Sequence, residues 1–188
     1  MRRFTMWNNR YRGDVYINGT TPNRFLSRVS TFVKKGSVLC LGEREGRNAV
    51  YLAREGYDVS AVNSSALVLE EADRLADQSY VDINTQVAEL SEYDIRPKRW
   101  SGIVSIFCQI PSTVRQKLHR KVVAGLKPGG VFIMEAYRSD LVTSLAQLKL
   151  ELAGLEFLHV KEVVRDVHEN GCLKRDMALV QVVARKPF

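Results

Sequence analysis

Short apolar runs alternate with helical patterns along the chain. The apolar runs have the length of buried strands and lie at residues 37–41, 57–62, 83–88, 102–107, 131–136, 157–167 and 177–184. Patterns with apolar residues on one helical face lie at 22–33, 48–53, 65–76, 111–123 and 140–153. Strands that alternate with helices are typical of βαβ units and a mainly parallel sheet. The pattern therefore predicts an α/β fold.

Turn and cap residues mark several of these boundaries. Thr21 can cap the helix of residues 22–33, and Pro22 suits its first turn. Ser64 or Ser65 begins the third helix. The last two strands are joined by a short turn, which makes them antiparallel because a parallel pair needs a long crossover. The predicted sheet is therefore parallel except at its C-terminal hairpin.

The length and composition suit one domain with one core, since the chain has 188 residues and 45% of them are hydrophobic. It contains no repeat, low-complexity segment or linker. No apolar run approaches the roughly 20 residues of a membrane span, so we expect no membrane partner.

The three cysteines, Cys40, Cys108 and Cys172, are widely spaced and form no CxxC or Cys/His cluster. This spacing indicates neither a metal site nor a disulfide framework. Reduced thiols are typical of a cytoplasmic protein, which is the location we expect. We predict that Cys40 and Cys108 are buried, reduced and not joined to each other.

The chain carries a formal net charge of +7, which can favour acidic partners such as nucleic acid. Its basic residues are scattered, however, and their densest groups lack the interleaved aromatic side chains of a base-stacking surface. A generally basic, solvated surface is the favoured interpretation, and nucleic acid is not the expected partner.

Three strand ends carry candidate ligand-binding residues, because ligands bind at the carboxyl ends of strands in an open parallel sheet. The first strand runs into the turn Gly42-Glu43-Arg44-Glu45-Gly46, whose glycines let the backbone approach a ligand. Asn63 ends the second strand, where it can bond ribose hydroxyls, and Glu89 ends the third, where it can meet an adenine amino group. The spacing from Gly42 to Asn63 is about that between the glycine turn and the ribose-binding residue of a nucleotide-binding fold. The motif G-x-x-x-G alone also occurs in ordinary strand-to-helix turns.

Five segments occur in order along the chain: MWNNRYRGDVYINGTTPNRFL, LGEREGRNAVYLAREGYDVSAVNSS, VSIFCQIP, LKPGGVFIMEAY and LEFLHVKEVVRDVHENG. Together they resemble the tellurite-resistance-type branch of the class I S-adenosylmethionine (SAM)-dependent methyltransferases. The resemblance covers essentially the whole chain. It implies a Rossmann-like fold in a single domain over 1–188, with an N-terminal lid and helix over 1–35 and a SAM-binding-type core over 36–188. It also implies a seven-stranded, mainly parallel sheet with an antiparallel last strand.

The resemblance also implies a SAM site across the first two strand ends. The glycine turn would lie under the methionine part, and the ribose and adenine would follow at the second and third strand ends. The fourth strand end, with Phe107 and Cys108, would border the transferred methyl group, and the N-terminal segment would fold over the site. The candidate cofactor-binding residues are Gly42, Glu43, Arg44, Gly46, Asn63, Ser64, Glu89, Leu90, Phe107, Arg10 and Tyr11.

Methyl transfer needs little acid–base chemistry, because the sulfonium is already reactive and the protein mainly aligns donor and acceptor. The sequence contains no recognisable catalytic triad. His168, next to Glu169, is the best acid–base candidate, and its alternative role is that of a strand-end residue bonded to backbone. His119 is expected on the surface of its helix.

Four positions depart from the family's pattern. The usual turn is roughly Asp-x-Gly-x-Gly-x-Gly, and here Cys40 stands at the Asp and Arg44 at the central glycine. Asn63 stands where the family has an acidic residue that binds the ribose, and Glu89 stands where it has a shorter Asp. A side chain at Arg44 would strain a turn with positive φ, occupy ligand volume, turn outward or pair with the carboxylate of the cofactor. The stretch after Tyr137 also lacks the longer, glycine-rich loop of relatives.

These features leave three candidate functions. The first is a SAM-dependent methyltransferase that acts on an unidentified small molecule. The second is a degenerate member of the family, with weakened or lost SAM binding, that acts as a non-catalytic binding module. The third, a nucleic-acid methyltransferase or binder, rests on charge alone, because the Asn/Asp-Pro-Pro-Tyr/Phe signature of amino-group DNA methyltransferases is absent.

The dispersed basic residues generate a first prediction. We expect no tight, specific binding to duplex or single-stranded nucleic acid, because such binding needs several cations aligned on the phosphate backbone. Fluorescence anisotropy at physiological salt measures this directly. Submicromolar affinity with a steep salt dependence would contradict it.

Overall fold

The structure is a computed structural model that describes residues 16–138, 145–169 and 171–188. The predicted lid residues Arg10 and Tyr11 lie outside these ranges, as does the first part of the predicted helix 140–153. The elements run in the order α2 Arg24–Val29, η1 Ser30–Phe32 (a 3-10 turn), β1 Ser37–Leu41, α3 Arg47–Arg54, β2 Asp58–Asn63, α4 Ala66–Gln78, β3 Asn84–Val87, β4 Trp100–Ile106, α5 Ser112–Gly125, β5 Leu126–Tyr137, α6 Leu145–Glu151, β6 Glu156–Glu169 and β7 Cys172–Arg185.

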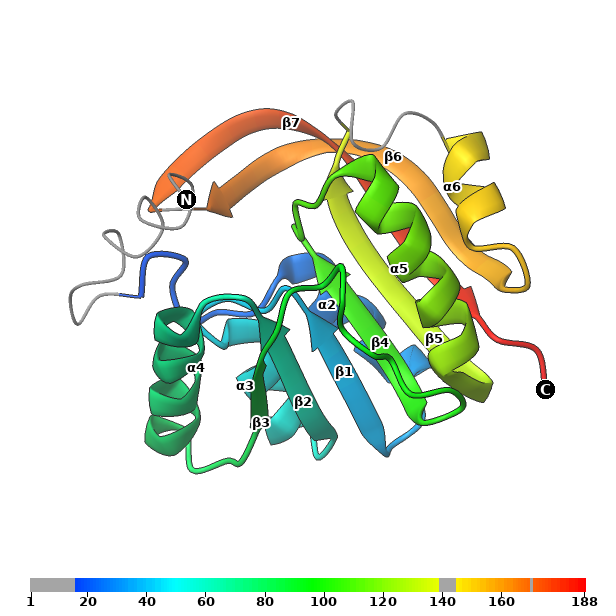
Figure 1. The fold of residues 1–188 in the computed structure, drawn as a ribbon. Coiled ribbons are helices and arrows are strands. Elements are labelled where there is room, and N and C mark those ends of the chain that lie inside the picture. The colour runs from blue at the N-terminus through cyan, green and yellow to red at the C-terminus, as the bar shows by residue number, and fades with distance from the viewer. Residues whose placement is uncertain (1–15, 139–144, 170) are drawn as a thin grey trace.

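The strands form one seven-stranded sheet in the order β3-β2-β1-β4-β5-β7-β6 (Figure 1). The pairs among β1 to β5 are parallel. The long hairpin of β6 and β7 is antiparallel, and β7 also runs antiparallel to β5. The prediction of a mainly parallel sheet with an antiparallel last strand is therefore confirmed.

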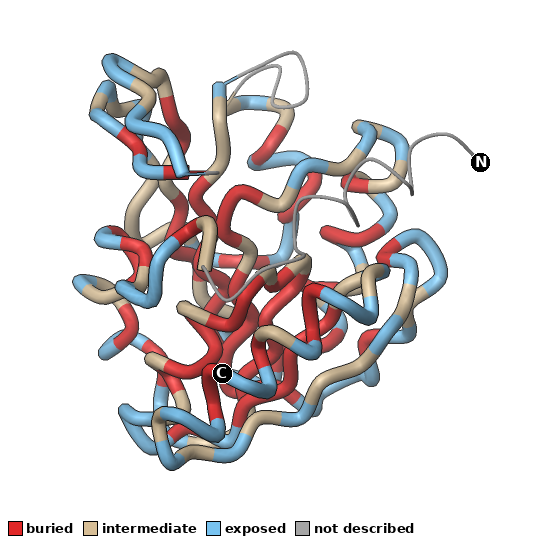
Figure 2. Tube along the Cα trace, turned by 90° about the vertical axis from the view of Figure 1, so that its left-hand side faces the viewer, coloured by how far each residue is buried: buried red, intermediate tan, exposed pale blue. Residues whose placement is uncertain are grey.

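Helices cover both faces of the sheet and create two separate cores. Successive residues of β1 point to opposite faces, so Val38 and Cys40 pack with α2 and α3, while Leu39 and Leu41 pack with α5 and α6. Buried residues consequently run through the centre of the molecule, with exposed segments around them (Figure 2). Burial on both faces explains why these strands are continuous apolar runs in the sequence.

The start of the first helix differs from the prediction. Asn23 occupies the N-cap, and its side-chain oxygen accepts hydrogen bonds from the main-chain N–H groups of Phe25 and Leu26 at 2.9 and 3.0 Å. Thr21 is therefore not the cap, and Pro22 lies before the helix. The main-chain N–H of Asn23 donates to Oδ1 of Asn48 on α3 at 2.9 Å, so a tertiary contact selects this cap.

The strand order reverses at β1, which lies between β2 and β4, and the glycine turn follows β1 at this switch point. Gly46 is the N-cap of α3 and has a left-handed conformation, with φ of 88°. A Cβ at Gly46 would lie 2.8 Å from Cα of Ala72 in α4. The glycine therefore permits both the turn and the close approach of α3 to α4.

This close approach generates a stability prediction. Gly46→Ala should lower the free energy of unfolding by about 3 kcal/mol, from left-handed strain and from overpacking against α4. Gly56→Ala is the matched control, because Gly56 has φ of 82° but nothing within 4 Å of its added Cβ. The control should lose only about 1 kcal/mol. Equal losses in urea denaturation of the two variants would contradict the packing argument.

Candidate functional site

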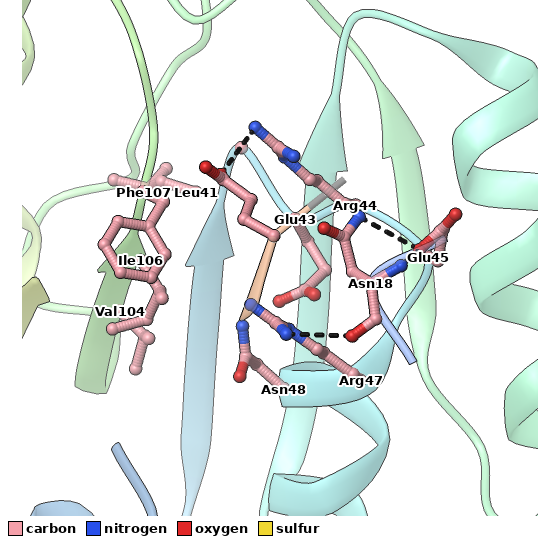
Figure 3. Close-up of a pocket in the computed structure, with 12 residues that line it drawn as sticks. Asn18, Leu41, Glu43, Arg44, Glu45, Arg47, Asn48, Val104, Ile106 and Phe107 are labelled. Atoms are coloured by element: carbon pink, nitrogen blue, oxygen red, sulfur yellow. Dashed lines mark hydrogen bonds and ion pairs between the residues drawn. The ribbon is translucent and has the colours of Figure 1, made fainter. Parts of the chain in front are cut away.

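A polar cavity lies at the carboxyl ends of β1 and β4, next to the glycine turn (Figure 3). It encloses about 380 Å³, including the part open to solvent. Its walls come from the N-terminal segment, the glycine turn, the start of α3, the end of β4 and the end of β6. The lining residues are Asn18, Leu41, Gly42, Glu43, Arg44, Glu45, Arg47, Asn48, Val104, Ile106, Phe107 and Glu169.

Arg44 joins the glycine turn to the far end of β6. Its Nη2 lies 3.1 Å from Oε1 of Glu169, which is buried. The described non-glycine residues with positive φ are Tyr80, Lys98, Phe107 and Asp176, so Arg44 adopts ordinary backbone geometry. The strain expected at this position is therefore absent, and the side chain instead forms one wall of the cavity.

Glu169 is the central acid of the cavity. The Tyr137 hydroxyl donates to its Oε2 at 2.5 Å, and Nζ of Lys174 donates to the same oxygen at 3.0 Å. Oε1 is buried and, although it lies near Arg44, no donor among the described residues is aligned to give it a hydrogen bond. This oxygen can therefore accept a hydrogen bond from a ligand.

The ionisation of this group is set by its neighbours. Burial alone would raise the pKa of Glu169, but the Tyr137 hydroxyl, Arg44 and Lys174 outweigh it and hold the pKa below its usual value. The pKa of Tyr137 is raised well above its usual value by burial and by the adjacent carboxylate. At neutral pH the cavity is therefore lined by an ionised Glu169, which accepts a hydrogen bond from the neutral Tyr137 next to it.

The N-terminal segment is tied to the glycine turn through Glu45. Its carboxylate accepts main-chain hydrogen bonds from Ile17 at 2.9 Å and from Asn18 at 2.8 Å. Nη1 of Arg47 donates to the carbonyl oxygen of Asn18 at 2.9 Å. These contacts bring residues 17–18 to the cavity, and the sequence pattern alone did not single out Asn18, Glu45, Arg47 or Asn48.

A second buried carboxylate, that of Glu43, lies at the start of α3. It accepts main-chain hydrogen bonds from Arg44 and Asn48, and burial raises its pKa despite these bonds and the nearby Arg47. Cys40 is buried, and burial raises the pKa of its thiol. The buried carboxylate of this region therefore belongs to Glu43, three residues after Cys40 in the sequence.

The predicted cofactor residues Asn63, Ser64, Glu89 and Leu90 do not line this cavity. Asn63 donates from Nδ2 to the carbonyl oxygen of Glu43 at 2.6 Å, and its Oδ1 accepts from the main-chain N–H of Ser65 at 2.9 Å. Its side chain therefore already braces the turn. Ser64 and Glu89 are exposed at the ends of β2 and β3, and Leu90 is buried.

The wall at the end of β4 is aromatic. Phe107 stacks on Tyr137 with 4.9 Å between ring centroids, and it has a positive φ of 50°. Cys108 follows it and is half-buried rather than fully buried as predicted, while Cys40 is fully buried. Both cysteines are free, as is the exposed Cys172, so the expected absence of a disulfide between Cys40 and Cys108 agrees with the structure.

The two histidines singled out from the sequence lie elsewhere. His168 is exposed, whereas its neighbour Glu169 is buried, because successive strand residues point to opposite faces. Val167, two residues before Glu169, is apolar and buried, and residues two apart in a strand share a face. This alternation is the sequence signal that Glu169, not His168, points inward. His119 is not on the surface: it is 3% exposed and its Nδ1 lies 2.8 Å from Oε2 of Glu151 on α6.

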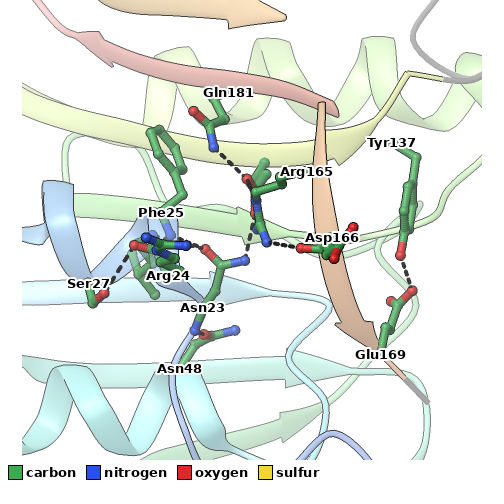
Figure 4. A network of polar contacts seen from close by, with 12 residues as sticks. Asn23, Arg24, Phe25, Ser27, Asn48, Tyr137, Arg165, Asp166, Glu169 and Gln181 are labelled. Atoms are coloured by element: carbon green, nitrogen blue, oxygen red, sulfur yellow. Dashed lines mark hydrogen bonds and ion pairs between the residues drawn. The ribbon is translucent and has the colours of Figure 1, made fainter. Parts of the chain in front are cut away.

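A buried polar network joins the segment before α2 to β5, β6 and β7 (Figure 4). The carboxylate of Glu135, at the end of β5, is fully buried and accepts hydrogen bonds from Asn23 at 2.6 Å, from Gln181 at 2.7 Å and from Arg165 at 2.5 and 3.2 Å. The main-chain carbonyl of Glu135 accepts from the N–H of Phe107 at 2.8 Å. The network therefore connects the N-terminal segment, β5, β6 and β7 to the aromatic wall.

The described residues include no helix long and apolar enough to cross a membrane. They also include no group of three or more His, Cys, Asp or Glu side chains placed to hold a metal ion.

Residues 38–130 match the family model described as a methyltransferase domain. No curated protein matches the chain. Among solved structures, TehB from Haemophilus influenzae has a TM-score of 0.77 at 21% identity, over 90% of this chain and 64% of that one. An S-adenosylmethionine-dependent methyltransferase from Clostridium acetobutylicum has a TM-score of 0.69 at 15% identity, over 98% of this chain and 99% of that one. The [4+2]-cyclase SpnF has a TM-score of 0.68 at 15% identity, over 87% of this chain and 80% of that one.

At these identities the structural likeness concerns the fold, which is that of the class I methyltransferases. S-adenosylmethionine is the cofactor that this fold and the matched domain imply. The similarity to a cyclase shows that one fold hosts several reactions, so the fold alone does not identify the reaction of this chain.

The network around Glu135 generates the next prediction. Glu135→Gln should lower the free energy of unfolding by about 3 kcal/mol, because it leaves the guanidinium of Arg165 without its buried counter-charge. Glu162→Gln is the matched control, since Glu162 pairs with Arg138 on the surface. Its loss should stay below about 1 kcal/mol. Similar urea midpoints for the two variants would show that the network does not stabilise the fold.

Proposed function

We propose that this chain, whose residues 38–130 match the methyltransferase domain family, is an enzyme that transfers a methyl group from S-adenosylmethionine to a small molecule. The observation that carries the proposal is the set of charges in the cavity beside the glycine turn. That set complements an amino acid with a free carboxylate and a free ammonium group, which is the methionine part of the cofactor.

Glu169 would bind the ammonium group of the methionine part. Its Oε1 is buried, lies at the cavity and lacks an aligned hydrogen-bond donor among the described residues. Oε1 forms an ion pair with Arg44 at 3.1 Å but receives no aligned hydrogen bond, and an ammonium group would supply one. The pKa of Glu169 lies below its usual value, so the carboxylate is charged at neutral pH and suits a cation.

The guanidinium groups of Arg44 and Arg47, which both line the cavity, would bind the carboxylate of the methionine part. Arg44 stands where the family has glycine, yet its backbone is unstrained. Among the roles open to this side chain, we therefore favour pairing with the carboxylate of the cofactor. A guanidinium is well suited to this role because it is always charged and can bind a carboxylate with two parallel hydrogen bonds.

The bound cofactor supplies an electrophilic methyl group on its sulfonium. The residues of this chain then have to position the acceptor and exclude water. Phe107 and Tyr137 form a stacked pair next to the glycine turn, and this apolar wall suits water exclusion. We propose no catalytic role for the exposed His168.

The other proposed cofactor contacts follow the resemblance. Asn63 would receive the ribose through the hydrogen-bonding capacity that remains after its contacts with Glu43 and Ser65. Glu89 and Leu90 would flank the adenine. Assignment to the tellurite-resistance-type branch rests on the five sequence segments, and a cytoplasmic location rests on the free cysteines.

Calorimetry with S-adenosylmethionine and S-adenosylhomocysteine tests the proposal. We expect the wild type to bind both, and Arg44→Ala and Glu169→Gln each to weaken binding by about 10- to 100-fold, the value of a hydrogen bond to a charged group. Arg54→Ala is the control for loss of an arginine, because Arg54 is exposed at the end of α3.

Two other outcomes would contradict this view. Tighter binding by Arg44→Ala, and tighter still after Asn63→Asp is added, would mean that Arg44 occludes the site and that the wild type is a weakened family member. No binding by any of these variants would favour a non-catalytic module.

A further inference from the structure

A second cavity lies beside the first, on the face of the sheet that α5 covers. It encloses about 590 Å³, including the part open to solvent, and shares Leu41 and Phe107 with the first cavity. In contrast to the charged first cavity, its walls are mostly apolar. They include Leu41, Phe107, Ile110, Leu118, Phe132 and Met134.

One charged side chain, Arg115, lines this apolar cavity and is only 6% exposed. Its Nε and Nη2 donate to the two carboxylate oxygens of Glu151 at 2.9 and 2.8 Å. His119 contacts the same carboxylate, with Nδ1 2.8 Å from Oε2, and also lines the cavity. The remaining nitrogen, Nη1 of Arg115, is buried and has no hydrogen-bond partner among the described residues.

Nη1 of Arg115 can donate a hydrogen bond but has no acceptor among the described residues. A guanidinium stays charged, and leaving one of its N–H groups buried without a partner is costly. Buried polar groups in native proteins are nearly always satisfied. Arg115 lines the second cavity, so a molecule bound there can provide the acceptor that the described residues do not.

The charge balance of the cavity favours an uncharged molecule. Burial raises the pKa of Glu151, but hydrogen bonds from His119 and Arg115 outweigh it and lower the pKa to about 2, so this carboxylate neutralises Arg115. Burial raises the pKa of the Cys108 thiol to about 11, which keeps it neutral. A second carboxylate would be desolvated here beside a cation that is already paired.

We propose that this second cavity binds the methyl acceptor as an uncharged, largely apolar small molecule whose oxygen accepts a hydrogen bond from Nη1 of Arg115. The proposal rests on the proposed function only in calling this ligand the methyl acceptor. It specifies an oxygen-bearing apolar compound and disfavours oxyanions and nucleic acid as ligands of this cavity.

Three small probes test the chemistry without the cofactor. Acetophenone has an aromatic body and a carbonyl oxygen, ethylbenzene has a similar shape without the oxygen, and benzoate adds a charge. The readout is the chemical shift of ¹³C-labelled methionine methyl groups. Met134 lines the cavity, while the partly buried Met177 packs against the core on the opposite face of the sheet and serves as the internal control.

We expect acetophenone to shift the Met134 signal and to bind about 10- to 100-fold more tightly than ethylbenzene. Arg115→Lys keeps a positive charge for Glu151 but lacks the nitrogen that corresponds to Nη1, so it should abolish the preference for acetophenone over ethylbenzene. Arg115→Met with Glu151→Met removes the ion pair as a unit, which avoids an isolated buried charge. It should abolish the preference in the same way.

Each contrary result is distinct. Equal binding of acetophenone and ethylbenzene by the wild type would overturn the role of Arg115. Tighter binding of benzoate would overturn the uncharged class, and no shift of Met134 with any probe would overturn the cavity as a binding site. Failure of the proposed function would instead appear as absent SAM binding in calorimetry, which these cofactor-free titrations do not involve.

Discussion

The carboxylate of Glu135 has no access to solvent, and the fold has to compensate it with donors from other elements. Asn23 comes from the segment before α2, Arg165 from β6 and Gln181 from β7. Because all of them converge on one group, Asn23 just before α2 and the strands β6 and β7 are fixed relative to β5. The position of β6 in turn brings Glu169 to the glycine turn, so the candidate site depends on this buried charge.

The glycine turn carries charged side chains, and each of them has a partner. Glu43 is a buried carboxylate that accepts main-chain hydrogen bonds at the start of α3. Arg44 reaches Glu169 instead of straining the turn. A charged side chain in a tight turn can thus be paired with a residue more than a hundred positions away in the chain.

The two cavities differ in polarity although they meet at Leu41 and Phe107. The first is lined by guanidinium and carboxylate groups and suits a zwitterion. The second is apolar and has one unsatisfied donor, on Arg115. The proposed transfer from a charged donor to a less polar acceptor requires both environments side by side, and the aromatic pair of Phe107 and Tyr137 lies where they meet.

The sequence by itself determined the strands, their mainly parallel arrangement and the place of the glycine turn, because burial on both faces of a sheet requires continuous apolar runs. The sequence also predicted Glu43 and Arg44, which line the cavity, whereas only the tertiary structure decided the other polar side chains of the site and their partners. The pairing of Arg44 with Glu169, the burial of His119 against Glu151 and the cap at Asn23 all join residues distant in sequence. Local patterns record which side of an element is apolar, whereas the partner of a buried charge is set by how separate elements pack.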